Sequence, residues 1–230
     1  MKTLGIVGGI GPESTIEYYR FILDGCRAHK GESAPHIIID SIDVNRGIAM
    51  LDANDLTALA DYISQSIGRL IRAGADVALI AANTPHIVFD AVEARSAIPL
   101  ISLVQAACDR AQALGLERLG LLGTGFTMRG EFYPRVFTRA GLELVTPKDD
   151  EMELIHFAYI NELLKNTFRP ETRTAIVQII ERMRNEEAVM AVLLAGTELP
   201  LLLRRAEPAG VSFLDTTLIH VEAAVSAICL

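Results

Sequence analysis

Three pairs of short apolar segments recur in the same order in the two halves of the 230-residue chain. The matched pairs are LGIV at Leu4 and LGLL at Leu119, LIAANT at Leu79 and LLAGTE at Leu193, and IPLISLV at Ile98 and VSFLDTT at Val211. One match would mean little, because apolar strands resemble one another, but three in order at a nearly constant offset indicate an internal duplication. The chain is therefore predicted to fold as two similar halves.

Within each half, short runs of Val, Ile, Leu and Gly alternate with longer amphipathic segments, which is typical of strand–helix units around a parallel sheet buried on both faces. The segment 55–73 has apolar residues at helical spacing and is followed by Gly74, a helix-ending residue. A second helix is predicted over 171–185. Strands are predicted at 3–8, 36–41, 77–81, 100–102, 118–122, 143–145, 189–195 and 213–215.

The predicted fold class is therefore α/β, with two pseudosymmetric parallel-sheet domains. The first domain comprises 1–98 plus 211–230 and the second 99–210, so that the chain crosses over near Pro99 and returns at its end. In such sheets ligands bind beyond the carboxyl ends of the strands. Equivalent turns of the two halves are thus expected to enclose one active-site cleft between the domains.

Composition excludes several classes of protein. The net charge of −8 and the isoelectric point near 5.2 argue against nucleic-acid binding. No apolar run approaches the roughly 18 to 20 residues of a membrane-spanning helix. Cys26, Cys108 and Cys229 are widely spaced and form no CxxC, so neither a disulfide framework nor a metal site is predicted. We expect a soluble, cytoplasmic protein with no nucleic-acid or membrane partner.

The motif GGIGPEST follows the first predicted strand and opens a helix. Gly9 and Gly11 let backbone amides approach an anion, and Pro12 suits a first helical turn. A carboxylate or phosphate ligand is one interpretation, and a tight strand-to-helix turn without a ligand is the other. A nucleotide is a further alternative, although Ser14 stands where GxGxxG has its third glycine.

The motif ANTPH follows the third strand of the first half. Asn83 offers an amide, Thr84 a hydroxyl and a backbone donor, and His86 an acid or base near a helix start. A lone histidine is often structural, so that alternative stays open for His86. Ala82, the residue before them, has only a methyl group and can do no chemistry.

The second half has matching turns. In LLGTGFTM, Thr124 and Thr127 either contact a ligand or cap a helix. In AGTELP, Thr197 offers a hydroxyl, and Glu198 either transfers a proton or caps the next helix. In DTTLIH, His220 is expected to orient other groups.

Together these motifs resemble those of the aspartate/glutamate racemase superfamily, especially its aspartate racemase branch. The likeness runs through nearly the whole chain, in KTLGIVGGIGPEST, ANTPH, LLGTGFTM, GTELP and DTTLIH. The resemblance implies a racemase-like fold with two α/β domains, no cofactor, no metal, a small dicarboxylate or amino-dicarboxylate substrate, and a homodimer.

The family mechanism uses two cysteines, one to remove the α-proton and one on the opposite face to return it. The resemblance places those cysteines at Ala82 and Gly196, so both thiols are missing. The substrate-binding positions that the resemblance implies are Asn83, Thr84, Thr124, Thr127 and Thr197. Gly9 and Gly11 of the glycine turn and the counter-charges Arg46 and Lys165 complete the predicted binding residues.

The leading hypothesis is a cofactor-independent amino-acid racemase of the aspartate/glutamate type, with Glu198 on one side of the substrate and His86 or a bound water on the other. One alternative is a protein that has lost catalysis and binds carboxylates. Another is a lyase or decarboxylase acting on a malonate-like acid.

Overall fold

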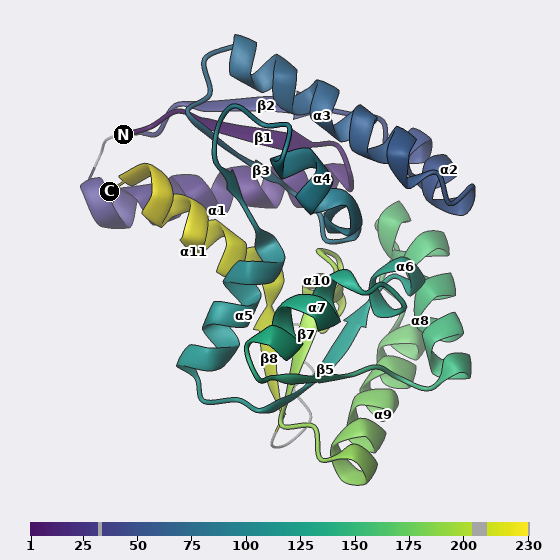
Figure 1. The fold of residues 1–230 in the computed structure, drawn as a ribbon. Coiled ribbons are helices and arrows are strands. Elements are labelled where there is room, and N and C mark those ends of the chain that lie inside the picture. Colours follow the sequence, from purple (N-terminus) through teal and green to yellow (C-terminus); the bar gives the residue numbers. More distant parts are fainter. Residues whose placement is uncertain (32–33, 204–210, 230) are drawn as a thin grey trace. The chain divides into compact units, whose positions relative to one another are not determined.

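The computed structural model describes residues 1–31, 34–203 and 211–229, in which strands and helices alternate along the chain (Figure 1). The strands of the first sheet are β1 (Leu4–Gly8), β2 (Ile37–Ser41), β3 (Val77–Ile80) and β4 (Leu100–Ile101). Those of the second sheet are β5 (Arg118–Gly123), β6 (Glu143–Val145), β7 (Ala191–Ala195) and β8 (Ser212–Asp215).

The two sheets have the same strand order. The first runs β2-β1-β3-β4 and the second β6-β5-β7-β8, and all of the described pairings are parallel. Each strand of the second sheet thus takes the place of its counterpart in the first. This confirms the predicted α/β fold with two similar parallel sheets.

The chain forms two compact units, Met1–Ala106 with Thr217–Leu230, and Ala107–Thr216. The predicted divisions lie a few residues earlier, after 98 and after 210. The second of them borders on 204–210, which lie outside the described residues. β4 pairs with β3 and β8 pairs with β7. Each unit therefore contains all four strands of its sheet, and the chain crosses to the other unit after the fourth strand.

The first unit has helices on both faces of its sheet (Figure 1). Leu4 and Ile6 pack against α1 and α11, whereas Val7 packs against α3, because successive side chains of β1 point to opposite faces. The helices of this unit are α1 (Pro12–Lys30), α2 (Val44–Asp52), α3 (Leu56–Arg72), the 3-10 helix η1 (Thr84–Val88), α4 (Phe89–Glu93), the start of α5 (Leu103–Ala113) and nearly all of α11 (Thr216–Cys229).

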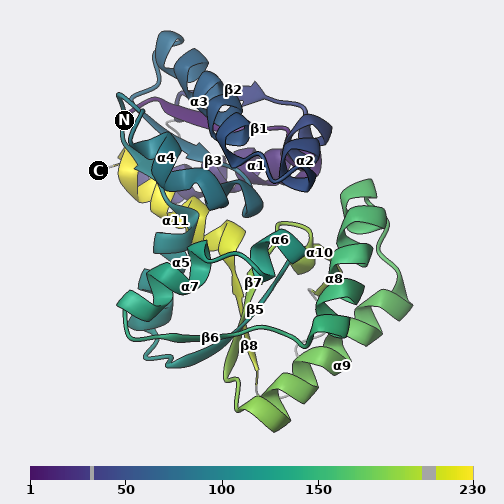
Figure 2. The same ribbon diagram turned by 45° about the vertical axis from the view of Figure 1, so that its right-hand side comes forward.

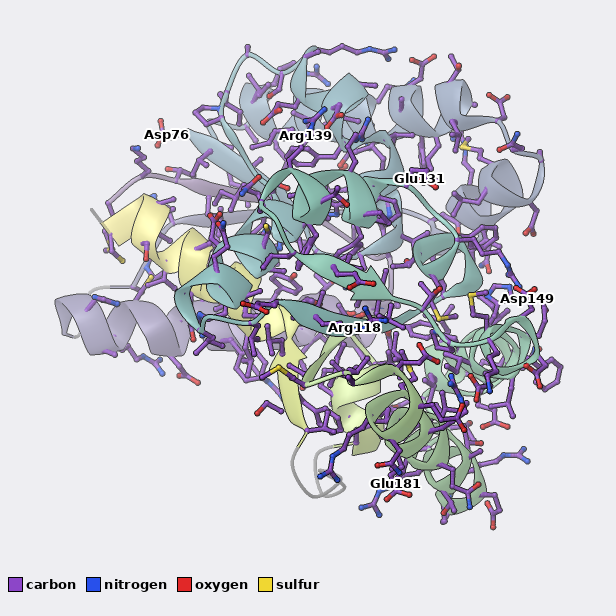
Figure 3. The ribbon with its side chains drawn as sticks, turned by 60° about the horizontal axis from the view of Figure 1, so that its bottom comes forward. Asp76, Arg118, Glu131, Arg139, Asp149 and Glu181 are labelled. Carbon is purple, nitrogen blue, oxygen red and sulfur yellow. The ribbon has the colours of Figure 1, made fainter. Side chains whose placement is uncertain are left out.

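In the second unit, α8 (Asp149–Asn161) and α9 (Pro170–Glu187) lie side by side (Figure 2) and share one core with Leu122, Val192 and Leu194 of the sheet. Arg118, at the start of β5 (Figure 3), donates a hydrogen bond of 2.6 Å to the carbonyl oxygen of Glu187, where α9 ends. The other helices are α6 (Gly125–Met128), α7 (Phe132–Arg139), the 3-10 helix η2 (Leu163–Lys165) and α10 (Leu199–Leu203).

The sequence signals for the regular elements are confirmed. Each observed strand overlaps its predicted range. The helix predicted over 55–73 is α3, which begins after Asp55, whose carboxylate accepts the amide hydrogen of Ala58 at 2.9 Å. Gly74 follows it with a φ of 98°, a conformation that glycine adopts without strain. Within the described residues, no helix combines the length and apolar character that crossing a bilayer requires.

An ion-pair network fixes α8 against α9. Arg182 of α9 donates two hydrogen bonds of 2.6 Å to the carboxylate of Glu151 on α8 and also pairs with Glu187. Burial alone would raise the pKa of Glu151, but the hydrogen bonds from Arg182 outweigh it and hold that pKa below its usual value. The bidentate geometry therefore sets the position of α8 relative to α9.

Replacing Arg182 tests this contribution. We expect Arg182→Gln to lower the free energy of unfolding by about 1 to 3 kcal/mol, because it leaves a half-buried carboxylate without its partner. The matched control is Arg27→Gln, which breaks an exposed pair with Asp24 and should change the free energy by less than about 0.5 kcal/mol. Urea denaturation measures both, and equal changes would contradict the prediction.

Candidate active site

Apart from the two counter-charges, the predicted site residues lie in turns at the carboxyl ends of neighbouring strands. In the first unit, Val7 pairs with Ile80, so the glycine turn after β1 adjoins the turn that holds Asn83 and Thr84. In the second unit, Gly123 pairs with Ala195, so the turn of Thr124 and Thr127 adjoins that of Thr197 and Glu198. Each unit thus gathers its own predicted residues at one sheet edge.

The glycine turn is held by internal hydrogen bonds. Gly9 has a φ of 82°, and a Cβ there would lie 2.3 Å from the carbonyl oxygen of Ile42, so only glycine fits. Its amide donates to the hydroxyl of Thr15 at 2.9 Å, and that hydroxyl lies 3.3 Å from the carbonyl oxygen of Gly11, to which it donates. The Gly9 amide, which was predicted as a candidate donor to an anion, therefore donates its hydrogen bond within the turn.

His86 is buried with both ring nitrogens bonded to the backbone. Nδ1 donates to the carbonyl oxygen of Ala82 at 2.9 Å, and Nε2 accepts the amide hydrogen of Leu103 at 3.1 Å, which fixes the tautomer. Burial lowers the pKa of His86 to about 4. The ring can gain a proton only by breaking the bond from Leu103, so it links the turn after β3 to the start of α5.

His220 also links separate segments of the first unit through both of its ring nitrogens. Its Nε2 donates to the carbonyl oxygen of Ile101 at 2.9 Å, and its Nδ1 accepts from the hydroxyl of Tyr18 at 2.9 Å. Burial, and then the proximity of His86, lower the pKa of His220 to about 3. The rings of His86 and His220 meet edge to face with centroids 6.0 Å apart. Two neutral imidazoles thus join α1, α11 and the ends of β3 and β4.

Thr124 and Thr127 cap the short helix α6. The Thr124 hydroxyl accepts the amide hydrogen of Thr127 at 3.3 Å, and the two hydroxyl oxygens are 3.2 Å apart. Of the two interpretations that the sequence left open, capping is the one that this geometry shows, and ligand contact stays a prediction. The amide of Gly125 donates to Nδ1 of His156 on α8 at 3.1 Å.

Glu198 is buried at the end of β7, where two hydroxyl groups hold it. Its Oε2 accepts from the hydroxyl of Tyr159 on α8 and, at 2.8 Å, from the hydroxyl of Thr197. In return, the amide of Glu198 donates to the Tyr159 oxygen at 3.4 Å. Tyr159 and Glu198 are 3% and 4% exposed, so this carboxylate is bonded to the protein and largely shielded from water.

Gly196 is glycine because Tyr159 fills the space beside it. A Cβ at position 196 would lie 2.5 Å from Cε2 and 2.6 Å from the hydroxyl oxygen of Tyr159. Gly196 does not have a positive φ, so the constraint is one of volume and not of backbone conformation. On the other half, Ala82 is 6% exposed, and its carbonyl oxygen binds His86.

The two predicted counter-charges lie on exposed helical segments. The guanidinium of Arg46 on α2 lies 4.6 Å above the ring of Tyr62, and Lys165 ends η2 with an exposed side chain. The three cysteines are buried free thiols within helices. In the part of the chain that the structure describes, no three His, Cys, Asp or Glu side chains form a metal-binding group.

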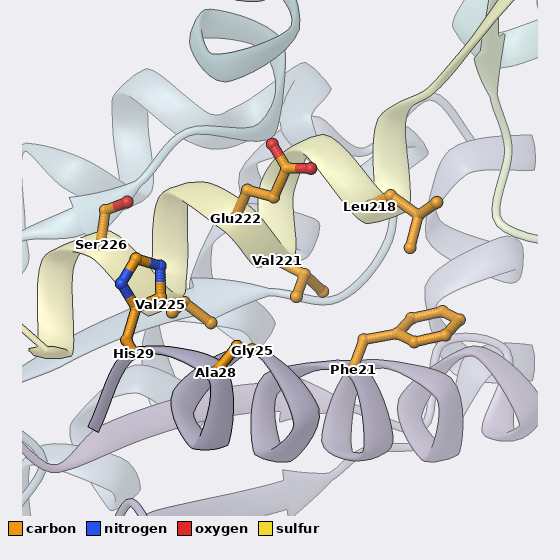
Figure 4. Close-up of a pocket in the computed structure, with 9 residues that line it drawn as sticks. All are labelled: Phe21, Gly25, Ala28, His29, Leu218, Val221, Glu222, Val225 and Ser226. Carbon is orange, nitrogen blue, oxygen red and sulfur yellow. The ribbon is translucent and has the colours of Figure 1, made fainter. Parts of the chain in front are cut away.

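A groove between α1 and α11 contains none of the predicted site residues (Figure 4). Apolar side chains and the backbone of Gly25 form most of its wall, and His29 and Glu222 are its titratable side chains.

Tyr159 and His156 are the residues that sequence reasoning missed. They are one helical turn apart on α8, and each bonds to a different turn of the sheet edge. The only signal in the sequence is two polar rings at helical spacing after the sixth strand. Nothing local indicates which turns these rings would reach.

Comparisons with known proteins agree with this architecture. A family model described as Asp/Glu/hydantoin racemase matches residues 7–224. The structure is similar to that of a candidate Asp/Glu racemase from Yersinia pestis, with 32% sequence identity, a TM-score of 0.90 and full coverage of both chains. It is also similar to an aspartate racemase homologue from Pyrococcus horikoshii OT3, with 31% identity, a TM-score of 0.82, and coverage of 100% of this chain and 99% of the other.

A curated relative matches over a shorter region. The broad specificity amino-acid racemase RacX of Bacillus subtilis (strain 168) is 23% identical over 150 residues, which are 62% of this chain. The match spans 63% of that relative's length, which is less than two thirds of it.

The two buried histidines predict a pH-dependent stability. Both pKa values are lowered in the folded state, so the unfolded chain binds protons that the folded chain does not as the pH falls below about 6.5. The free energy of unfolding should therefore be greatest above about pH 6.5. Well below that pH it should fall by up to about 1.4 kcal/mol per pH unit for each ring.

Urea denaturation from about pH 7.5 to about pH 5 measures this slope, above the range in which most carboxyl groups titrate. His29→Gln, an exposed substitution, is the control and should leave the slope unchanged. A flat profile, or His86 and His220 ring signals in proton NMR that titrate near pH 6.5, would show that these rings are not held neutral.

A side chain at position 196 should be unfavourable. We expect Gly196→Ala to lower the free energy of unfolding by about 1 to 3 kcal/mol, because the new methyl group displaces Tyr159. In a Tyr159→Ala background the same change should have a much smaller effect. Gly47→Ala on α2 is the control, because a Cβ there meets nothing within 4 Å and alanine favours a helix. Equal effects of Gly196→Ala in both backgrounds would exclude Tyr159 as the cause.

Proposed function

We propose that this protein, which belongs to the Asp/Glu/hydantoin racemase family, interconverts the enantiomers of a small acidic amino acid by removing and returning its α-proton. The acid and the base are a side chain of the protein and a bound water, without a cofactor. The two relatives above 30% identity, described as an Asp/Glu racemase candidate and an aspartate racemase homologue, support this substrate class. The cytoplasmic location and the homodimer stay predictions.

The observation that carries this proposal is the buried carboxylate of Glu198 at the end of β7. Removal of an α-proton needs a base that is held in place and shielded from water. The hydroxyls of Thr197 and Tyr159 orient Glu198 through its Oε2. We assign Glu198 the role of proton acceptor and donor for one face of the substrate.

The binding residues follow from the same turns. We propose that the amide of Asn83 and the hydroxyls of Thr84, Thr124, Thr127 and Thr197 hold the carboxylates and the amino group of the substrate. Arg46 and Lys165 serve as counter-charges, and Gly9 and Gly11 shape the first turn. Since the capping bonds already engage Thr124 and Thr127, their hydroxyls have fixed directions, which favours selective binding.

For the other face of the substrate, the structure favours a bound water over His86. Both nitrogens of His86 are bonded to the backbone, and its lowered pKa keeps the ring neutral. We therefore propose that His86 positions the turn after β3 and does not transfer a proton itself.

A second candidate is a carboxylate-binding protein without turnover. The observation that favours it is the turn after β3, where Ala82 has no functional side chain and His86 is fully bonded. This alternative predicts that dicarboxylates raise the melting temperature while no Cα proton exchanges.

Proton NMR in heavy water separates the candidates. We expect the Cα proton signals of both enantiomers of aspartate or glutamate to disappear, with interconversion of the enantiomers. Glu198→Gln should slow the interconversion of the enantiomers by at least about 10²-fold, because an amide cannot accept the proton. The control Glu171→Gln changes an exposed acid at the start of α9 and should leave the rate unchanged.

Retention of the Cα signal together with a thermal shift on adding aspartate would support the binding alternative and contradict a racemase of these substrates. Release of carbon dioxide from a malonate-like acid would identify a decarboxylase instead.

A further inference from the structure

The phenol of Tyr159 occupies the place where a side chain at position 196 would begin. A Cβ at 196 would lie 2.5, 2.6 and 2.9 Å from Cε2, the hydroxyl oxygen and Cζ of Tyr159. The resemblance to the racemases places a cysteine at this position. The Tyr159 hydroxyl therefore lies in the volume that the thiol of such a cysteine would approach.

We propose that Tyr159 is a further catalytic residue, which transfers the α-proton in the second unit with Glu198 as its proton partner. This inference rests on the proposed racemase function and names the group that meets the substrate. Tyr159 would then replace the missing thiol, with Glu198 as its proton reservoir.

The transfer is a concerted relay in which two protons move together and their exchange balances. The Cα–H bond of the substrate breaks, its electron pair stays on Cα, and its proton moves to the Tyr159 oxygen. At the same time the proton of the Tyr159 hydroxyl moves to Oε2 of Glu198. The result is a neutral phenol, a protonated Glu198 and a substrate carbanion. The reverse sequence delivers a proton to the carbanion.

The hydrogen bonds around the pair suit each part of this relay. The Tyr159 hydroxyl already donates to Oε2 of Glu198, so the second transfer needs no rearrangement. The Thr197 hydroxyl donates to the same oxygen at 2.8 Å and stabilises the carboxylate. The Glu198 amide donates a hydrogen bond of 3.4 Å to the Tyr159 oxygen and so stabilises partial negative charge on that oxygen during the transfer.

A relay also agrees with the protonation state of the phenol. Burial, followed by the charge of Glu198, raises the pKa of Tyr159 well above its usual value of 10.0. A free tyrosinate base is therefore unfavourable at neutral pH, and the relay never forms one. The near-complete burial of both side chains also shields the hydrogen bond between them from competition by bulk water.

Tyr133 provides a matched control in the same unit. It too is fully buried, and its hydroxyl bonds to the side chain of Thr216 and not to a carboxylate. Tyr133→Phe removes one buried hydroxyl without affecting the pair of Tyr159 and Glu198.

The test follows the two enantiomers of aspartate and glutamate separately in heavy water. Wild-type protein and Tyr133→Phe should exchange the Cα proton of both enantiomers and invert them. Tyr159→Phe should lower inversion by at least about 10²-fold. It should still exchange the Cα proton of one enantiomer, because the group on the opposite face remains.

Glu198→Gln, which keeps a side chain of the same shape, should give the same one-sided pattern because the relay loses its proton acceptor. If Tyr159→Phe fails to fold, exchange of both enantiomers by Glu198→Gln would still overturn the inference. A purely structural role for Tyr159 would lower the exchange of both enantiomers together, and that result would overturn the inference. Inversion by Tyr159→Phe at the wild-type rate would also overturn it while leaving the racemase function intact. If the wild type exchanges neither enantiomer, the proposed function fails, and this inference fails with it.

Discussion

Parallel pairing of strands that are buried on both faces determines where this protein can carry polar groups. β1, β3 and β7 consist almost wholly of buried residues, so a polar side chain within them would lose its hydration without gaining a partner. The turns after the strands are free of this restriction. Because all strands of a sheet point the same way, those turns lie together at one edge.

The two units satisfy their buried polar groups at that edge in different ways. In the first unit, two neutral histidines bond mainly to backbone groups, and the pKa of each is lowered by burial. In the second, a carboxylate is held by two hydroxyls, one of which is a phenol. The duplication has thus kept the scaffold while the chemistry of the turns has diverged. In the first unit the phenol of Tyr18 donates to a neutral imidazole, whereas in the second the phenol of Tyr159 donates to a carboxylate.

The sequence was sufficient to predict the elements and their repetition, because hydrophobic periodicity and strand-end turns are local properties of the chain. The sequence also indicated the cap of α6 by Thr124 as one of two alternatives. It did not indicate the partners of Glu198 and His86. Tyr159 comes from α8, 39 residues before Glu198, and His86 binds the backbone amide of Leu103, which has no sequence signature. Such contacts depend on how helices pack, which short motifs do not specify.

Gly196 shows why a missing residue cannot be interpreted alone. In the sequence, glycine at this position is notable only because the family cysteine is missing. In the structure, the absence of a side chain leaves the space that Tyr159 fills. A cysteine placed there would compete with the phenol for one volume and would separate it from Glu198. That carboxylate would keep the Thr197 hydroxyl while losing its closest partner. The residue at position 196 and the residue at position 159 of α8 therefore depend on each other. A cysteine fits at position 196 only if Tyr159 is moved or replaced by a smaller residue.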